Sequence, residues 1–108
     1  MRRPHLQISI AGPHQRAEIL ARRARRLRRK GELRSAALAL REACALVEGD
    51  AARWMMLGDL HVRLGKRREA ERAMKQALFL REQSGEDRKA DVIRRLLDDL
   101  VQADITIS

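Results

Sequence analysis

The chain has 108 residues, which is enough for one small domain and too few for two. Hydrophobic residues make up 44% of it and charged residues 36%, a balance that argues against wholesale disorder. Aromatic residues are only 2%, which argues against a sheet sandwich or barrel, whereas abundant Ala, Leu, Arg and Glu favour helices. The single cysteine, Cys44, excludes an internal disulfide framework and a cysteine-based zinc site.

Segments that would direct the chain to a membrane are not evident in the sequence. No apolar run approaches the ~20 residues that a membrane helix needs, and the N-terminus lacks the apolar core of a signal peptide. We therefore expect a cytoplasmic, all-α protein without membrane insertion.

Positive charge is concentrated in the first third of the chain. The net charge is +9, and residues 1–34 hold 11 basic and 2 acidic side chains, so the rest of the chain is balanced. Arginines outnumber lysines 20 to 4. This excess of arginine has two explanations, a functional basic surface or the codon composition of a GC-rich genome.

Both ends of the chain carry short stretches in which apolar and polar residues alternate. Residues 1–14 are expected to form an N-terminal tail, within which Leu6–Ile10 alternates as a β-strand does. Residues 104–108 alternate in the same way and form a C-terminal tail. These stretches are either frayed tails or strands that pair with each other or with a partner's sheet edge.

Between the tails, apolar residues recur three and four positions apart, as on the buried face of a helix. Gly31 and Gly65 end two of these stretches. Asp50 is a suitable N-cap, and Ser84 with Asp87 has the spacing of a capping box. The expected helices cover about residues 15–30, 32–47, 51–64, 67–83 and 85–102.

An offset of 34 residues lays the third and fourth expected helices over the first and second. Small residues then fall on small residues, and large apolar residues fall on large ones. A helix-turn-helix period of this length is typical of a helical solenoid. The matched pairs are Leu20 with Trp54, Ala24 with Gly58, Leu27 with His61, Ala36 with Ala70, Leu40 with Met74, and Ala43 with Ala77.

The second copy reads Trp54-x-x-Leu57-Gly58-x-x-His61, followed by Ala70-x-x-x-Met74 and Ala77. This pattern resembles the tetratricopeptide repeat (TPR) family, with His61 in place of the usual Tyr and Met74 in place of the usual Phe. The first copy is weaker, since Leu20 stands where the family has Trp and Ala24 where it has Gly.

The resemblance implies an all-α, right-handed helical solenoid. It would consist of two TPR hairpins, at about residues 17–50 and 51–84, and a capping helix at about residues 85–103. Together these would form a TPR domain over residues 15–103.

Small residues in the pattern imply close helix crossings. A larger side chain at Gly58 or Ala24 would push the two helices of a repeat apart. Ala36 and Ala70 would allow the same close packing from the opposite helix. Trp54 and the neighbouring Leu57 would fill the space between the helices.

Seven of the nine residues from 22 to 30 are basic. This stretch has three interpretations: a solvated outer face, a docking surface for an acidic protein segment, or a phosphate-binding helix. Stacking on single-stranded bases requires aromatic residues, of which the chain has few. The basic residues are Arg22, Arg23, Arg25, Arg26, Arg28, Arg29 and Lys30.

By resemblance, a TPR array binds peptides or helices in a groove lined by the first helix of each repeat. A lining that mixes arginines with apolar residues suits an amphipathic acidic segment, and the alternative is an unused face. The chain lacks the Lys and Asn set with which some family members clamp a terminal carboxylate. The expected lining residues are Ala21, Arg25, Arg28, Met55, Asp59 and Val62.

No catalytic, metal or cofactor site is expected. His5, His14 and His61 are scattered, and His61 occupies a core position of the repeat. Cys44 is expected to be a small packed residue, and Asp98-Asp99 to balance charge on the last helix. We therefore expect a small non-enzymatic adaptor or scaffold that binds a partner protein. The alternatives are a nucleic-acid-associated protein that uses the basic helix and a homo-oligomeric scaffold that uses the last helix or the tails.

Overall fold

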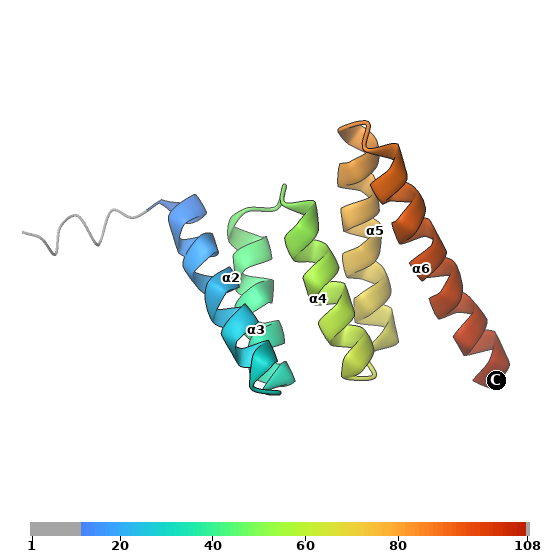
Figure 1. Ribbon diagram of the computed structural model, residues 1–108, viewed down its shortest axis with the longest axis horizontal. Helices are drawn as coiled ribbons and strands as arrows, with labels where there is room; N and C mark the ends of the chain where they lie inside the picture. Colours follow the sequence, from blue (N-terminus) through green and yellow to red (C-terminus); the bar gives the residue numbers. More distant parts are fainter. Residues whose placement is uncertain (1–11, 108) are drawn as a thin grey trace, which may run out of the picture.

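The computed structural model describes residues 12–107, with side chains over residues 12–103. This range holds no strand, which confirms the prediction of an all-α protein, while Leu6–Ile10 lies outside the described residues. The five described helices are α2 (Pro13–Arg29), α3 (Leu33–Leu46), α4 (Ala51–Arg63), α5 (Arg67–Gln83) and α6 (Asp87–Ile107) (Figure 1).

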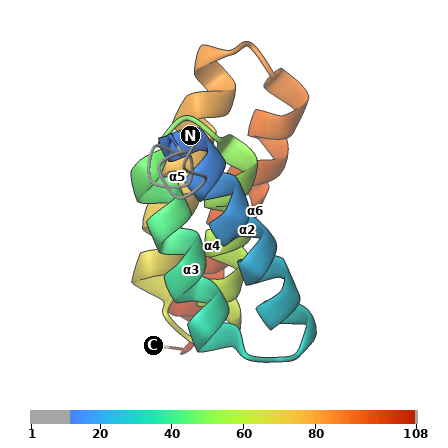
Figure 2. The same cartoon turned by 90° about the vertical axis from the view of Figure 1, so that its left-hand side faces the viewer.

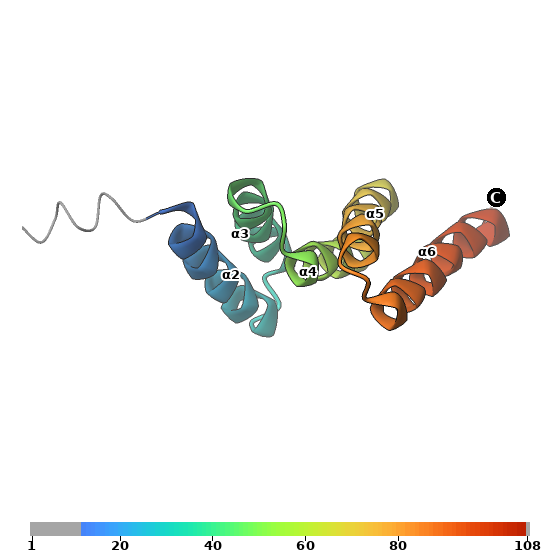
Figure 3. The same cartoon turned by 90° about the horizontal axis from the view of Figure 1, so that it is seen from above.

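The helices form a single row in which consecutive members run in opposite directions (Figure 1). Each helix packs mainly against its neighbours in sequence, α2 on α3, α3 on α4, α4 on α5 and α5 on α6. Seen from above, α2, α4 and α6 lie along one side of the row and α3 and α5 along the other (Figure 3). In the view along the row, α2 and α3 stand in front (Figure 2). The row therefore has two distinct long faces.

The three hairpins α2–α3, α4–α5 and α5–α6 turn in the same way. Gly31, Gly65 and Gly85 have φ angles of +82°, +75° and +71°, in the left-handed region that glycine adopts without strain. The residue after each glycine donates its amide to a carbonyl five residues earlier, which ends the preceding helix. These bonds run from Glu32 to Leu27 (2.9 Å), from Lys66 to His61 (2.8 Å) and from Glu86 to Arg81 (2.9 Å).

Two helix starts have clear local causes. Helix α2 begins at Pro13, two residues before the predicted start, because the fixed φ angle and missing amide hydrogen of proline suit the first helical position. Helix α4 follows Asp50, whose carboxylate accepts a hydrogen bond of 3.2 Å from the Arg53 amide. The predicted N-cap of this helix is therefore confirmed.

The last helix differs from its prediction at both ends. The predicted capping box is wrong, because the Ser84 hydroxyl lies 3.0 Å from the Leu80 carbonyl and 2.8 Å from the Glu86 carboxylate instead of capping α6. At the other end α6 continues to Ile107, past the predicted boundary near residue 103. No glycine or proline interrupts residues 87–107, and each added residue extends an existing helix, so the short alternation of residues 104–107 does not produce a strand.

The first of two apolar clusters joins α2, α3 and α4 and consists mostly of alanine. Leu40, Leu60 and Cys44 are the largest side chains that are fully buried. Small side chains let the helix backbones approach closely and fill the interior at high density. Among the repeat positions, Ala24, Ala36, Leu57, Gly58, His61, Ala70, Met74 and Ala77 are buried, and Leu20, Leu27 and Trp54 are half-buried.

Gly58 lies where α4 packs tightly against α5. A Cβ atom built on it would be 2.9 Å from Met74 Cγ and 3.4 Å from the Ala70 carbonyl oxygen. The two helices therefore approach at a distance that only glycine accommodates without movement of a neighbour.

Helix α6 is attached through the second apolar cluster, in which Ile93 is buried together with Met74 and Ala77 of α5. Trp54 contacts both clusters and so links the first hairpin to the C-terminal half. In the part of the chain that the structure describes, no helix has the length and apolar character to cross a membrane.

Candidate functional site

The basic stretch of α2 divides into paired and unpaired side chains. Arg22 Nε lies 3.0 Å and Arg25 Nη2 3.7 Å from the Glu18 carboxylate. The remaining five have no ion pair with any residue that the structure describes. Four of them are exposed, and Arg28 is half-buried. We call the four exposed side chains the basic surface: Arg23, Arg26, Arg29 and Lys30.

Local structure favours cations at this position. Arg26, Arg28 and Arg29 lie in the last turn of α2, where the negative end of the helix dipole stabilises positive charge. Ile19 is 57% exposed and lies four and seven residues before Arg23 and Arg26, on the same side of the helix. The basic surface thus adjoins an exposed apolar side chain.

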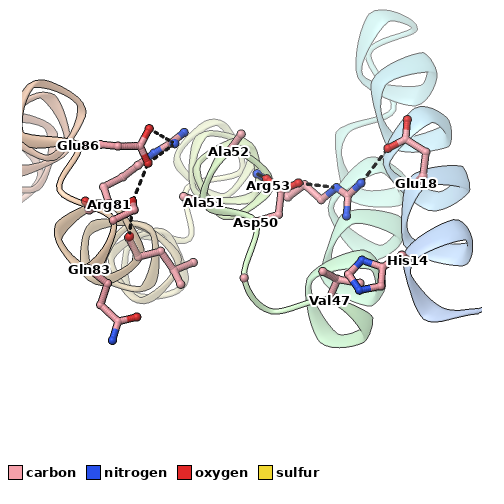
Figure 4. A pocket seen from close by; sticks show the side chains of 13 residues that line it. His14, Glu18, Val47, Asp50, Ala51, Ala52, Arg53, Arg81, Gln83 and Glu86 are labelled. Carbon is pink, nitrogen blue, oxygen red and sulfur yellow. Dashed lines mark hydrogen bonds and ion pairs between the residues drawn. The ribbon is translucent and has the colours of Figure 1, made fainter.

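The N-terminal ends of α2 and α4 enclose a hollow of about 810 Å³, together with the turn between α5 and α6 (Figure 4). Arg53 extends across it from α4 and donates a hydrogen bond of 2.8 Å to Glu18, while its Nε lies 3.3 Å from Asp50. Hydrogen bonds from Arg22 and Arg53 hold the pKa of Glu18 below its usual range.

On the far side of the same hollow, Arg81 Nη1 lies 3.0 Å from both carboxylate oxygens of Glu86. Hydrogen bonds from Ser84, Arg81 and Lys89 lower the pKa of Glu86 to about 2. The charged groups of this hollow are therefore already satisfied by one another, so it serves as a structural junction between helices.

The residues expected to line a groove of the first helices differ in their exposure. Ala21 has no exposed surface and packs in the first cluster, so its side chain is not accessible to a partner in this structure. Its spacing from Ala17 and Ala24, four and three residues away, places it on the face of α2 that packs in the core.

The other expected groove residues differ in how much surface they offer. Met55 is half-buried and packs in the second cluster against α6, while Val62 is 42% exposed. Asp59 pairs with Arg63 at 3.2 Å, and Arg25 with Glu18. Arg28 is half-buried and has no ion pair with a described residue, so Val62 is the one member of the expected lining that is exposed without such a contact.

A second hollow, of about 700 Å³, lies between α3 and α5, and residues of α4 form its floor. We call it the α3–α5 trough. Sequence reasoning missed it, since the charged residues on its walls occupy positions that the repeat pattern leaves unspecified. Its lining comprises Arg41, Ala45, Glu48, Trp54, Leu57, His61, Lys66, Glu69, Arg72, Ala73 and Gln76.

His61 is the one buried polar side chain on the floor of the trough, with 6% of its surface exposed. Its Nδ1 is enclosed and has no hydrogen-bond partner within residues 12–103. Burial lowers the pKa of His61, and the nearby Lys66 and Arg41 act in the same direction, while Glu69 opposes them. The ring is therefore uncharged at neutral pH.

Nucleophilic and metal chemistry finds no support in the described residues. Cys44 is fully buried, and burial raises the pKa of its thiol to about 12, so it is a packing residue. The described histidine, cysteine and acidic side chains form no group of three that could hold a metal ion.

Comparison with known proteins gives no family assignment, because the chain matches no protein-family model and no curated protein.

Proposed function

We propose that the protein is a small non-enzymatic adaptor of the TPR type, which binds an acidic or amphipathic segment of a partner protein through the basic surface of α2. The observation that carries this proposal is the accumulation of five cations without acidic partners on one helix, within the described chain. Opposite charge steers such a segment to the surface and determines its orientation there.

Three features support the TPR assignment and the solenoid that it implies. The hairpins α2–α3 and α4–α5 repeat after 34 residues, and each turns at a left-handed glycine with the same hydrogen bond. Small residues, Ala24 and Gly58, are buried at equivalent positions of the two hairpins. Helices α2, α4 and α6 lie along one side of the row, and α3 and α5 lie along the other (Figure 3). In this assignment α6 is the capping helix.

The chemistry of the surface favours an amphipathic partner. Ile19 lies beside the arginines of α2, and Val62 offers an exposed apolar side chain on α4. A segment with acidic residues on one side and a few apolar residues on the other would complement both kinds of side chain.

Binding of nucleic acid is the second candidate, since the same cations can contact phosphates through charge alone. The aromatic residues needed for base stacking are distant from the basic surface in sequence and lie on other helices. Trp54 lines the trough on α4, and Phe79, which is 52% exposed, lies on α5. The protein segment is therefore the favoured partner.

Affinity capture with matched charge variants tests the proposal. The tagged protein would be incubated with native lysate, half of it treated with nuclease, alongside the variant Arg23→Glu/Arg26→Glu. The control is Arg68→Glu/Arg88→Glu, which reverses exposed charges on α5 and α6. We expect a protein that is retained after nuclease treatment, lost with the α2 variant and kept with the control.

Two results would count against the proposal. Retention of the partner by the α2 variant would move the binding site away from the basic surface. Loss of all bound protein after nuclease treatment, with steep salt dependence of the remaining nucleic-acid binding, would establish the second candidate instead.

A further inference from the structure

The α3–α5 trough lies on the opposite side of α4 from the expected groove. Helices α3 and α5 form its two walls, and both run upward in Figure 1, so that residues late in each helix lie near the upper end. Its volume of about 700 Å³ is within the range of sites that bind small ligands.

Both cations and anions line the trough. Arg41 is eight residues into α3 and Arg72 five residues into α5, so at 1.5 Å per residue they stand on opposite walls in its middle part. Glu69 is in the first turn of α5, at the lower end, and Glu48 follows the end of α3, at the upper end. Lys66 precedes α5 and lies at the lower end with Glu69. The two arginines therefore occupy the middle part of the trough, with one acidic side chain towards each end.

None of these charged side chains is already neutralised by the protein. Arg41, Arg72 and Lys66 form no ion pair with another described residue, nor do Glu48 and Glu69. This distinguishes the trough from the hollow at the helix N-termini, where Arg53 and Arg81 are both paired. The lining carries a net charge of +1 with His61 neutral, which suits a monovalent anion better than a multiply charged one.

The floor between the walls is apolar. Leu57 is buried beneath the trough, and Ala45 and Ala73 line its sides. The Trp54 indole N–H donates to the Glu48 carbonyl at 2.8 Å, so the donor is used and the ring is fixed in place. A ligand in the trough would therefore meet apolar surface below and guanidinium groups on either side.

We propose that the α3–α5 trough is a ligand site for a carboxylate carried on a small apolar body, with the carboxylate between Arg41 and Arg72 and the apolar body against Trp54 and Leu57. Guanidinium groups bind carboxylates through paired, charge-assisted hydrogen bonds. His61 lies in the floor of the trough, and its Nδ1 has no hydrogen-bond partner among the described residues. Two sources share this chemistry, a free short-chain acid and an acidic side chain of a peptide.

Trp54 is the only tryptophan in the chain, so tryptophan fluorescence comes from one position, in the lining of the trough. The full-length protein would be titrated with hexanoate, with the neutral analogue hexanamide, and with the blocked dipeptide acetyl-Leu-Glu-amide. The variant Arg41→Gln/Arg72→Gln removes the two cations, and the control Arg68→Gln/Arg88→Gln removes the same charge from exposed positions of α5 and α6 outside the trough. Both pairs are exposed, so folding should persist, and circular dichroism would check it.

We expect a saturable fluorescence change with an acid, at least tenfold weaker binding of hexanamide, and the same loss in Arg41→Gln/Arg72→Gln but not in the control Arg68→Gln/Arg88→Gln. Tighter binding of hexanoate would assign a free acid, and tighter binding of the dipeptide would assign a peptide. The proposal is overturned if neither acid gives a saturable change, if hexanamide binds equally well, or if the double variant binds like wild type. If Arg41→Gln/Arg72→Gln unfolds, two other measurements test the proposal. They are the binding of hexanoate to Lys66→Gln, which removes another cation of the lining, and the comparison of hexanoate with hexanamide in the wild-type protein.

Discussion

Arg53 of α4 donates a hydrogen bond of 2.8 Å to Glu18 of α2, across 35 positions of sequence. The Arg53 side chain is mostly buried, and its Nε also lies 3.3 Å from the carboxylate of Asp50, the N-cap of α4. One guanidinium therefore connects the start of the first hairpin to the start of the second. In Figure 4 it lies between the two carboxylates.

We expect Arg53→Gln to lower the melting temperature, because it leaves Glu18 and Asp50 without this shared cation. Glu18→Gln should lower it less, since the amide oxygen can still accept a hydrogen bond. The double variant should be less destabilised than the two single changes together, as expected for groups that interact directly. Thermal unfolding of all four proteins followed by circular dichroism measures this coupling, and strictly additive effects would contradict it.

The effect of a substitution at Gly58 on stability should depend on the size of the new side chain, since alanine adds one carbon atom and leucine adds four. A Cβ would meet Met74 Cγ at 2.9 Å, but the methionine side chain is flexible, and alanine is the better helix former by about 1 kcal/mol. Gly58→Ala is therefore expected to be close to neutral. Gly58→Leu should destabilise by about 1–3 kcal/mol through overpacking against α5.

Urea unfolding followed by circular dichroism would measure both Gly58 variants. Ala52→Leu places a leucine at an exposed position of α4 and is the matched control. A free energy of unfolding for Gly58→Leu equal to that of the control would show that the α4–α5 crossing is not close, and would count against the TPR assignment.

Helix positions in this chain could be predicted because they depend on local signals. Gly31 and Gly65 end helices, Asp50 begins one, and apolar spacing identifies the buried faces. The end of α6 was misjudged because a four-residue alternation is weaker evidence than the absence of any residue that stops a helix.

Candidate sites were harder to predict because they combine residues from separate helices. Ala21 was assigned to a groove by analogy, although its spacing places it in the core. The trough depends on Arg41 and Arg72, which line the same hollow only after α3 and α5 have packed on α4. Sequence spacing does not reveal such a pairing.

Acid should destabilise the protein partly through Glu86. Its pKa in the folded state is about 2, well below the usual 4.5, so the folded protein resists protonation that the unfolded chain accepts. This contribution is fully present above about pH 5 and is lost as the pH falls from 4.5 towards 2.

Melting temperatures measured between pH 6 and pH 2 would test the role of Glu86. We expect Glu86→Gln to have a lower melting temperature than wild type at pH 6 and a smaller difference at pH 2. Glu42→Gln, at an exposed position of α3, is the control and should parallel wild type throughout. An equal difference at both pH values would show that the Glu86 carboxylate is not held in its charged form.

His61 should cause a separate loss of stability at milder pH. Burial lowers its folded-state pKa below the usual 6.5, and Lys66 and Arg41 add to this effect against Glu69. Unfolded chains therefore bind a proton near pH 6 that the folded protein excludes, so stability is greatest above pH 6.5 and declines as the pH falls below it.

Replacing the imidazole removes the titrating group and its partnerless nitrogen together. We expect His61→Phe to keep a constant melting temperature between pH 7.5 and pH 5.5, over which wild type declines. His14→Phe changes an exposed histidine at the start of α2 and should decline as wild type does. A decline in His61→Phe equal to that of wild type would assign the effect to other groups, because no other described histidine is buried.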